Sequence, residues 1–106
     1  MTRLNLIRTS INDRPVFVVP HQGWLCGYIV APRACDSLSD CEELINCTFL
    51  DRYPALAERA GLSSDTLFAG VDTGHIWFKG KEMEISSITN QLMDLIEDIR
   101  SNYEDF

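Results

Sequence analysis

The first third of the chain alternates short β-forming runs with turn residues. Residues 3–9 and 15–19 are predicted to be the two arms of a β-hairpin, with Asn12-Asp13 as the turn between them. The second arm is rich in valine, and prolines at both of its ends favour an edge or strand-end position. A third strand is predicted at 24–30, between a glycine and a proline.

The hydrophobic period changes in the middle of the chain. Residues 37–47 open with serine and aspartate cap candidates and acidic residues, which favour the N-terminus of a helix, and apolar residues follow at helical spacing. A second short helix is predicted at 54–60. Proline suits its first position, and Gly61 suits the position just past its end.

The last third predicts two strands and a long helix. The strands are expected at 66–71 and 75–79, on either side of the tight segment 72–74. Apolar residues then recur at helical spacing, with Ser86 or Ser87 as the N-cap. The apolar stripe of this helix consists of Ile88, Leu92, Leu95, Ile96, Ile99 and Tyr103.

Together these elements predict one α+β domain spanning residues 1–106. We expect a small, mainly antiparallel sheet of about five strands, with two short helices and a long C-terminal helix packed on one face. The length is that of one domain, and the content of 45% hydrophobic and 24% charged residues is ordinary for a globular protein. A core of this size favours surface patches and shallow clefts over a deep internal cavity.

The charge of the chain is strongly negative. Nine Lys and Arg oppose 16 Asp and Glu, for a formal net charge of -7. Nucleic-acid binding draws on clustered Lys and Arg, so we expect no direct nucleic-acid partner and favour a protein with a basic surface. The alternative is that the charge only keeps the chain soluble. No apolar run approaches the roughly 20 residues that span a bilayer, so a cytoplasmic location and no membrane partner are expected.

The four cysteines do not form a recognisable metal or redox motif. They lie at positions 26, 35, 41 and 47, and no C-x-x-C is present. A disulfide framework is one reading. Cys41 and Cys47, however, are six residues apart on different faces of a predicted helix, so free thiols in a reducing cytosol are favoured.

Three segments together resemble a known group of proteins. They are residues 23–30, closed by Pro32, then residues 60–63, and then residues 68–75, which precede the amphipathic helix. In this order they resemble a loose family of small phage- and prophage-encoded proteins of uncharacterised function. That family carries a Trp-Cys-Gly-Tyr-Val segment, a Gly-Gly-Leu-Thr segment and a Gly-Phe-Asp-x-x-His segment.

The resemblance covers roughly residues 22–100 and departs from the family at two places. Members often carry histidines after the first segment's proline and before the Gly-Gly-Leu, where this chain has Arg33-Ala-Cys-Asp and Glu58-Arg-Ala. The resemblance implies a phage or mobile-element origin, and hence the cytoplasm of a bacterial host cell, more than any chemistry.

One set of residues supplies the side-chain types of a nucleophilic enzyme. Cys26, Asp72 and His75 would converge at one end of the sheet if residues 24–30 and 66–71 are neighbouring strands. A cysteine nucleophile needs a base within hydrogen-bond reach, and the base needs an orienting group. The same residues are an incomplete set for a metal. The plainer readings are that Cys26 is a core residue and that Asp72 hydrogen-bonds within its own turn, with no metal and no cofactor.

Two surfaces are candidates for partner binding. Trp24, Tyr28 and Trp77 are aromatic residues on predicted strands, and exposed aromatics often anchor interfaces. The acidic residues of the terminal helix form the second surface, which is otherwise a solvated helix face. These acidic residues include Asp94, Glu97 and Asp98.

The predicted function is therefore that of a small acidic phage-type accessory protein that binds another protein. Inhibition of a host nuclease or defence complex is the role that the resemblance implies. A small Cys/His/Asp hydrolase or metal-dependent enzyme is the alternative, and a structural or oligomerising module, such as a homodimer, is the third reading.

Overall fold

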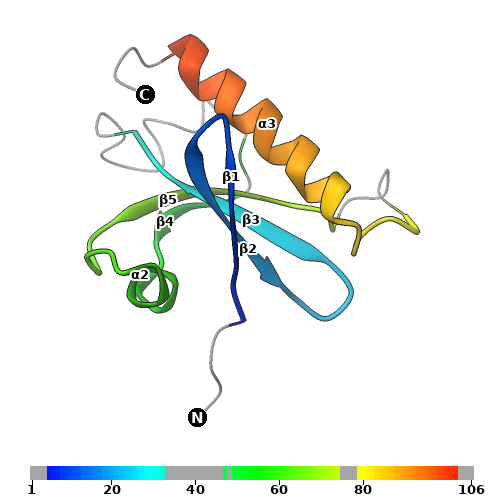
Figure 1. The fold of residues 1–106 in the computed structure, drawn as a ribbon, viewed down its shortest axis with the longest axis horizontal. Helices are drawn as coiled ribbons and strands as arrows, with labels where there is room; N and C mark the ends of the chain where they lie inside the picture. Colours follow the sequence, from blue (N-terminus) through cyan, green and yellow to red (C-terminus); the bar gives the residue numbers. More distant parts are fainter. Residues whose placement is uncertain (1–4, 33–46, 48, 75–78, 103–106) are drawn as a thin grey trace.

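The computed structural model describes residues 5–32, 47, 49–74 and 79–102. In this part of the chain, five antiparallel strands form one sheet in the order β1-β2-β3-β5-β4, and two helices accompany it (Figure 1). The α+β class, the five-stranded antiparallel sheet and the long C-terminal helix are thus confirmed. The elements are β1 (Ile7–Ile11), β2 (Arg14–Pro20), β3 (Leu25–Val30), β4 (Phe49–Arg52), α2 (Pro54–Ala60), β5 (Leu67–Asp72) and α3 (Ile85–Asn102).

The first two strands form the predicted hairpin. Its two-residue turn consists of Asn12 and Asp13, whose φ angles are 53° and 65°. Both residues therefore adopt the left-handed conformation of a type I′ turn, whose twist matches that of the flanking strands. Because this short turn pairs Ile11 with Arg14, the first strand spans Ile7–Ile11 and lies closer to the turn than the predicted 3–9.

The two helices lie on opposite faces of the sheet, so the expectation that the helices pack on one face is wrong (Figure 1). Alternate residues of β2 explain this arrangement. Val16 and Val18 belong to the core under α3, whereas Phe17 and Val19 belong to the core under α2. A strand with four consecutive buried residues has two faces to cover, and each helix covers one of them.

Helix α3 packs closely on the sheet because Gly27 leaves room for it. A Cβ atom at Gly27 would lie 2.7 Å from Cδ1 of Leu92 and 3.0 Å from Cγ1 of Ile88. Both side chains are fully buried members of the predicted apolar stripe. The helix begins at Ile85, so Ser86 and Ser87, the predicted caps, lie inside its first turn.

Helix α2 has the predicted bounds and the predicted C-terminal glycine. Gly61 has φ 73° and ψ 29°, and the following Leu62 N–H donates to the carbonyl of Ala57 at 2.8 Å. This is a Schellman-type ending, which favours glycine. Strand β4, directly before the helix, was not predicted. It has only four residues, and two of them are exposed.

Two predicted elements fall almost wholly outside the described residues. These are the helix at 37–47, of which only Cys47 is described, and the strand at 75–79, of which only Lys79 is described. Within the described ranges, neither α2 nor α3 combines the length and the apolar character needed to cross a membrane.

Candidate functional site

Cys26 and Asp72 lie opposite each other on neighbouring strands. They are direct partners in the antiparallel register of β3 and β5, at the end of the sheet where the chain leaves β5. The strands that carry these two residues are therefore neighbours, which is the condition under which the sequence predicts that the residues converge. His75, the expected base, lies outside the described residues, as does Trp77.

The surroundings of Cys26 favour the protonated thiol. Burial raises its pKa, and the nearby charge of Asp72 acts in the same direction, while hydrogen bonds with the Tyr28 and Trp24 side chains partly offset the rise. An activated cysteine nucleophile shows the opposite shift, because catalysis requires the thiolate. In the described part of the chain, Cys26 thus has the chemistry of a partly buried core thiol.

Three aromatic rings gather beside Cys26 on the α2 face of the sheet and form what we call the aromatic cluster: Tyr28, Phe49 and Tyr53. The Tyr28 ring meets those of Phe49 and Tyr53 edge to face, each with a centroid distance of 5.4 Å. Such perpendicular contacts are favourable for aromatic pairs. Tyr28, expected as a contact residue, has only 6% of its surface exposed and serves the core.

The pKa values of both tyrosines in the aromatic cluster are raised. Burial is the main cause that raises the pKa of Tyr28, with smaller contributions from Cys26, Tyr53 and Asp72. Burial also raises the pKa of Tyr53. The clustered hydroxyl and thiol groups are therefore neutral hydrogen-bonding groups near pH 7, and they are not a proton-transfer chain poised at that pH.

Trp24 presents the most accessible aromatic ring of this region. It lies in the turn between β2 and β3, is 40% exposed, and stacks on His21 with the ring centroids 5.3 Å apart and the planes 10° apart. The His21 N–H also donates to the Trp24 carbonyl at 2.8 Å. The described residues provide no hydrogen-bond partner for the buried Nε2 of His21. The stacked pair presents a partly exposed aromatic surface, and exposed aromatics often anchor interfaces.

The segment after β5 is a turn held by its own side chains. The Gly74 N–H donates to Oδ1 of Asp72 at 2.9 Å, as expected for an aspartate that hydrogen-bonds within its own turn. The next residue, Thr73, is fully buried and was missed by sequence reasoning. Its Oγ1 accepts the Leu25 N–H at 3.0 Å and donates to the Glu82 carbonyl at 2.6 Å. Thr73 therefore ties β3, β5 and the approach to α3 together.

The acidic side of α3 lines a groove of about 460 Å³. Its described lining comes from one side of the helix, where residues three and four positions apart are neighbours. Asp94 and Glu97 are exposed, Asp98 is half-buried, and buried Leu95 lies among them. All three predicted acidic residues thus meet at one hollow, together with Gln91 and Ser101.

A metal site is not assembled by the described residues. They contain no group of three or more His, Cys, Asp or Glu side chains placed to hold an ion. The two described cysteines pack against different cores, Cys26 against the core under α2 and Cys47 against the core under α3, so they do not pair with each other. Cys35 and Cys41 lie outside the described residues, so the expectation of free thiols stays a prediction.

Comparison with models of protein families, with curated proteins and with solved structures finds no match to this chain. The resemblance to small phage proteins therefore stays a prediction from the three sequence segments.

Proposed function

We propose that this chain is a protein-binding module that engages a basic surface of another protein through the acidic side of α3. The observation that carries the proposal is the groove in which Asp94, Glu97 and Asp98 meet. Complementary charge raises the association rate and selects against partners of like charge, which suits a function of recognition.

The packing of α3 supports this role because it fixes the acidic side relative to the sheet. The opposite side of the helix is buried against the sheet through Ile88, Leu92 and Ile99. Close packing on Gly27 leaves the helix little freedom to roll. The helix backbone that carries the carboxylates is thus held in place, so that less conformational entropy is lost when a partner binds.

The kind of partner follows from charge and from the resemblance. A basic protein surface is typical of enzymes that themselves bind nucleic acid, and the chain's net charge of -7 suits such a surface. The resemblance adds a phage setting, in which a host nuclease or a defence complex is the proposed target. The chain would act by occupying the surface that the target uses for nucleic acid.

The test compares two variants with the same change in net charge. Asp94→Lys/Glu97→Lys reverses two exposed charges in the groove, whereas Glu58→Lys/Glu84→Lys reverses two exposed charges elsewhere. Wild type and the Glu58/Glu84 variant should capture the same host protein from bacterial lysate, and capture should weaken as salt rises. The Asp94/Glu97 variant should lose it. Equal capture by both variants would reject the groove as the binding surface.

A further inference from the structure

Strand β1 leaves one of its edges without a partner strand among the described residues. It is the outermost strand of the sheet and pairs there only with β2. Arg8, Thr9 and Ser10 are all exposed, and Ile7 is 42% exposed. An exposed edge rich in β-branched residues is a template for another strand.

The hairpin register shows which backbone groups point outward. Ile11 and Arg14 flank the two-residue turn, and in such a hairpin they exchange both backbone hydrogen bonds. Bonded pairs alternate along an antiparallel ladder, so the next bonded positions of β1 are Thr9 and Ile7. The N–H and C=O groups of Arg8 and Ser10 therefore point away from β2.

The other side of β2 agrees with this assignment. The His21 N–H donates to the Trp24 carbonyl at 2.8 Å in the turn between β2 and β3. In an antiparallel ladder, the backbone N–H and C=O groups of every second residue point towards the same neighbouring strand, so those of the odd-numbered residues of β2 point towards β3. The backbone groups of the even-numbered residues of β2 therefore point towards β1. Pro15 fits as well, because it has no N–H, and the paired positions of β2 and β3 begin only at Phe17.

We propose that two copies of this chain associate by pairing their β1 strands antiparallel about a two-fold axis at Thr9. Arg8 of one copy then lies opposite Ser10 of the other, and their outward N–H and C=O groups exchange hydrogen bonds. Thr9 lies opposite its own counterpart. The two five-stranded sheets become one continuous sheet.

The sequence of β1 favours a second copy as the occupant of this edge. Ile7 and Ile11 are placed symmetrically about Thr9, which an isologous two-fold interface requires. In the proposed register, half-exposed Ile7 covers Ile11 of the second copy on the α3 face. Shifting the strands by two residues in one direction would place Arg8 opposite Arg8, which is unfavourable. Shifting them in the other direction would extend the pairing into the turn.

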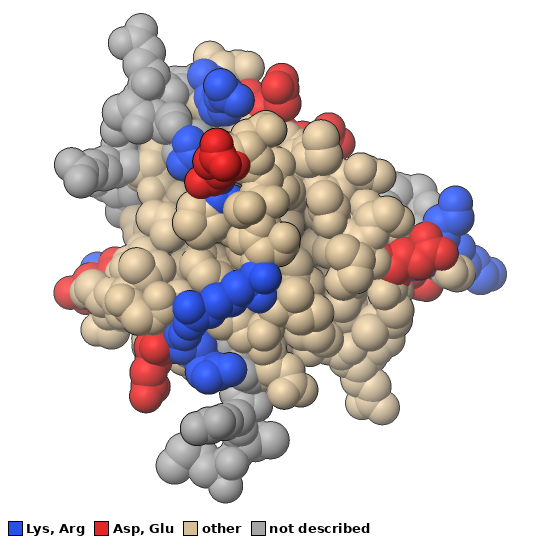
Figure 2. All heavy atoms as spheres, viewed as in Figure 1, with Lys and Arg blue, Asp and Glu red and all other residues tan. Residues whose placement is uncertain are grey.

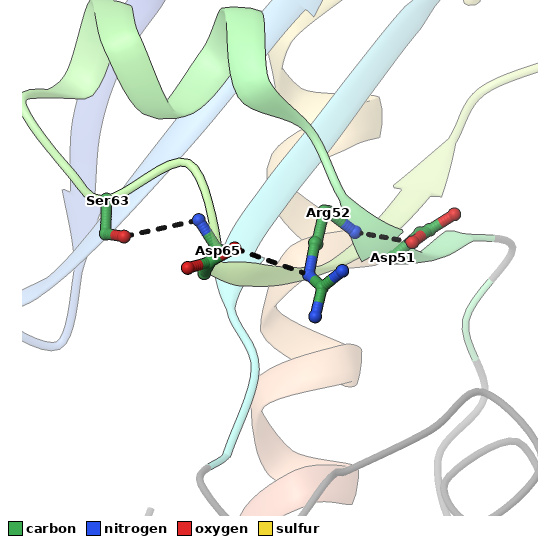
Figure 3. Close-up of polar contacts among 4 residues, drawn as sticks. All are labelled: Asp51, Arg52, Ser63 and Asp65. Atoms are coloured by element: carbon green, nitrogen blue, oxygen red, sulfur yellow. Dashed lines mark hydrogen bonds and ion pairs between the residues drawn. The ribbon is translucent and has the colours of Figure 1, made fainter.

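The opposite edge of the sheet is less suited to pairing. Strand β4 has only four residues, and two of them, Asp51 and Arg52, are charged and exposed. Figure 3 shows how they are engaged locally: the Arg52 N–H bonds to Asp51 at 2.7 Å, and Arg52 Nε lies 4.0 Å from Asp65. Short, charged edge strands are a common protection against pairing.

Charge also permits the approach of two β1 strands in spite of the acidic net charge. The only charged residue of β1 is Arg8. Figure 2 shows one side of the molecule, where uncharged residues cover most of the centre, a short run of Lys and Arg atoms reaches into it from the lower left, and Asp and Glu atoms lie mostly towards the margins. A two-fold axis perpendicular to the sheet would place both α3 helices on the same face of the joined sheet.

Sedimentation of the full chain over a concentration series tests the proposal. The wild-type mass should rise with concentration from 12.0 kDa towards twice that value. Ser10→Pro removes an outward N–H without touching the ladder to β2, and should weaken association by about tenfold or more. Ser10→Ala keeps the N–H and should associate like wild type. A wild-type chain that stays at 12.0 kDa throughout would overturn the proposal.

A second pair of variants does not depend on a proline. Ile7→Lys places a charge on the proposed contact and should abolish association, whereas Met93→Lys changes an equally exposed apolar residue on α3 and should not. Circular dichroism of each variant serves as the check that it is folded. Association of Ile7→Lys at wild-type strength would reject β1 as the interface.

Cysteine trapping tests the register. Thr9→Cys should form disulfide-linked dimers faster than Arg8→Cys or Ser10→Cys, measured against the wild-type background. In the proposed register only residue 9 meets its own counterpart, at a non-hydrogen-bonded position where side chains are closest. Faster trapping at position 8 or 10 would overturn the register centred on Thr9.

Discussion

The ring of Tyr28 lies directly against the backbone of Gly70 on the neighbouring strand. A Cβ atom at Gly70 would be 2.7 Å from Cδ1 and 2.8 Å from Cε1 of that ring. Gly70 pairs with Tyr28 on one side and with Phe49 on the other, so the glycine provides the space in which the aromatic cluster forms.

Gly70→Ala should therefore destabilise the protein by about 1–3 kcal/mol, the usual cost of inserting a group into a packed core. The ring cannot move aside easily, because Phe49 and Tyr53 pack against it. Urea unfolding measures the change. Gly74→Ala, in an exposed turn, is the comparison: its Cβ would lie 3.2 Å from Oδ1 of Asp72, a looser contact than that at Gly70, and it should cost clearly less stability.

A double-mutant cycle tests whether the Tyr28 ring is the cause. With Tyr28→Leu in the background, Gly70→Ala should cost clearly less than it does alone. Additive losses would mean that the cost arises elsewhere in the backbone.

Thr73→Val should cost about 1–3 kcal/mol in the free energy of unfolding. The substitution keeps the shape of the side chain but leaves the buried N–H of Leu25 and the carbonyl of Glu82 without the hydroxyl that bonds both. Thr73→Ser retains the hydroxyl and should lose much less. If Thr73→Val and Thr73→Ser were equally stable, the hydroxyl would not be the group that stabilises the segment before α3.

Stability should fall as pH rises through the alkaline range. Because burial raises the pKa of the Cys26 thiol and of the Tyr28 hydroxyl, the folded protein keeps these protons to higher pH than the unfolded chain. Above the unfolded pKa the unfolded chain releases more protons, so stability decreases until the folded pKa is passed. At pH values below the pKa of these groups in the unfolded chain, their full contribution to stability is present.

Cys26→Ala should therefore flatten the alkaline fall in stability measured by urea unfolding at a series of pH values. Peptide-mapped thiol labelling gives an independent measure. Cys26 should react only above the pH at which an ordinary thiol does. Labelling of Cys26 well below that pH would contradict the core-thiol assignment and support a nucleophile.

Asp13→Gly should stabilise the protein by roughly 0.5–1 kcal/mol, because glycine adopts positive φ at no steric cost and Asn-Gly is a preferred type I′ turn. Asp13 has φ 65° in the turn between β1 and β2. Thermal unfolding measures the gain. Asp13→Val, which resists this conformation, should lower stability, and the opposite order of the two variants would contradict the turn type.

Local patterns in the sequence were enough to predict the hairpin, α2 and α3. The turn at Asn12 and Asp13, proline and glycine around α2, and the apolar stripe of α3 each act over a few residues. Their consequences are therefore readable from the chain itself. The acidic side of α3 follows from the same helical spacing, so Asp94, Glu97 and Asp98 could be assigned to one surface.

Other features depend on contacts between distant residues. Strand β4 has no alternating pattern of its own and exists as a strand because Phe49 pairs with Gly70 of β5. Thr73 looks like an ordinary turn residue until Leu25 and Glu82 are placed beside it. No local signal marks either feature.

The sequence by itself determined which segments form strands and helices where the apolar period is clear. It indicated that Cys26 and Asp72 would lie close together only if their strands are neighbours, and the tertiary structure supplied that pairing. Only the tertiary structure decided that the helices cover opposite faces of the sheet and that Tyr28 is a core residue. The four consecutive buried residues of β2 indicate that both faces of the sheet are covered, because such a run has two apolar faces. Which element covers each face depends on how the whole chain packs, and local periodicity does not encode that choice.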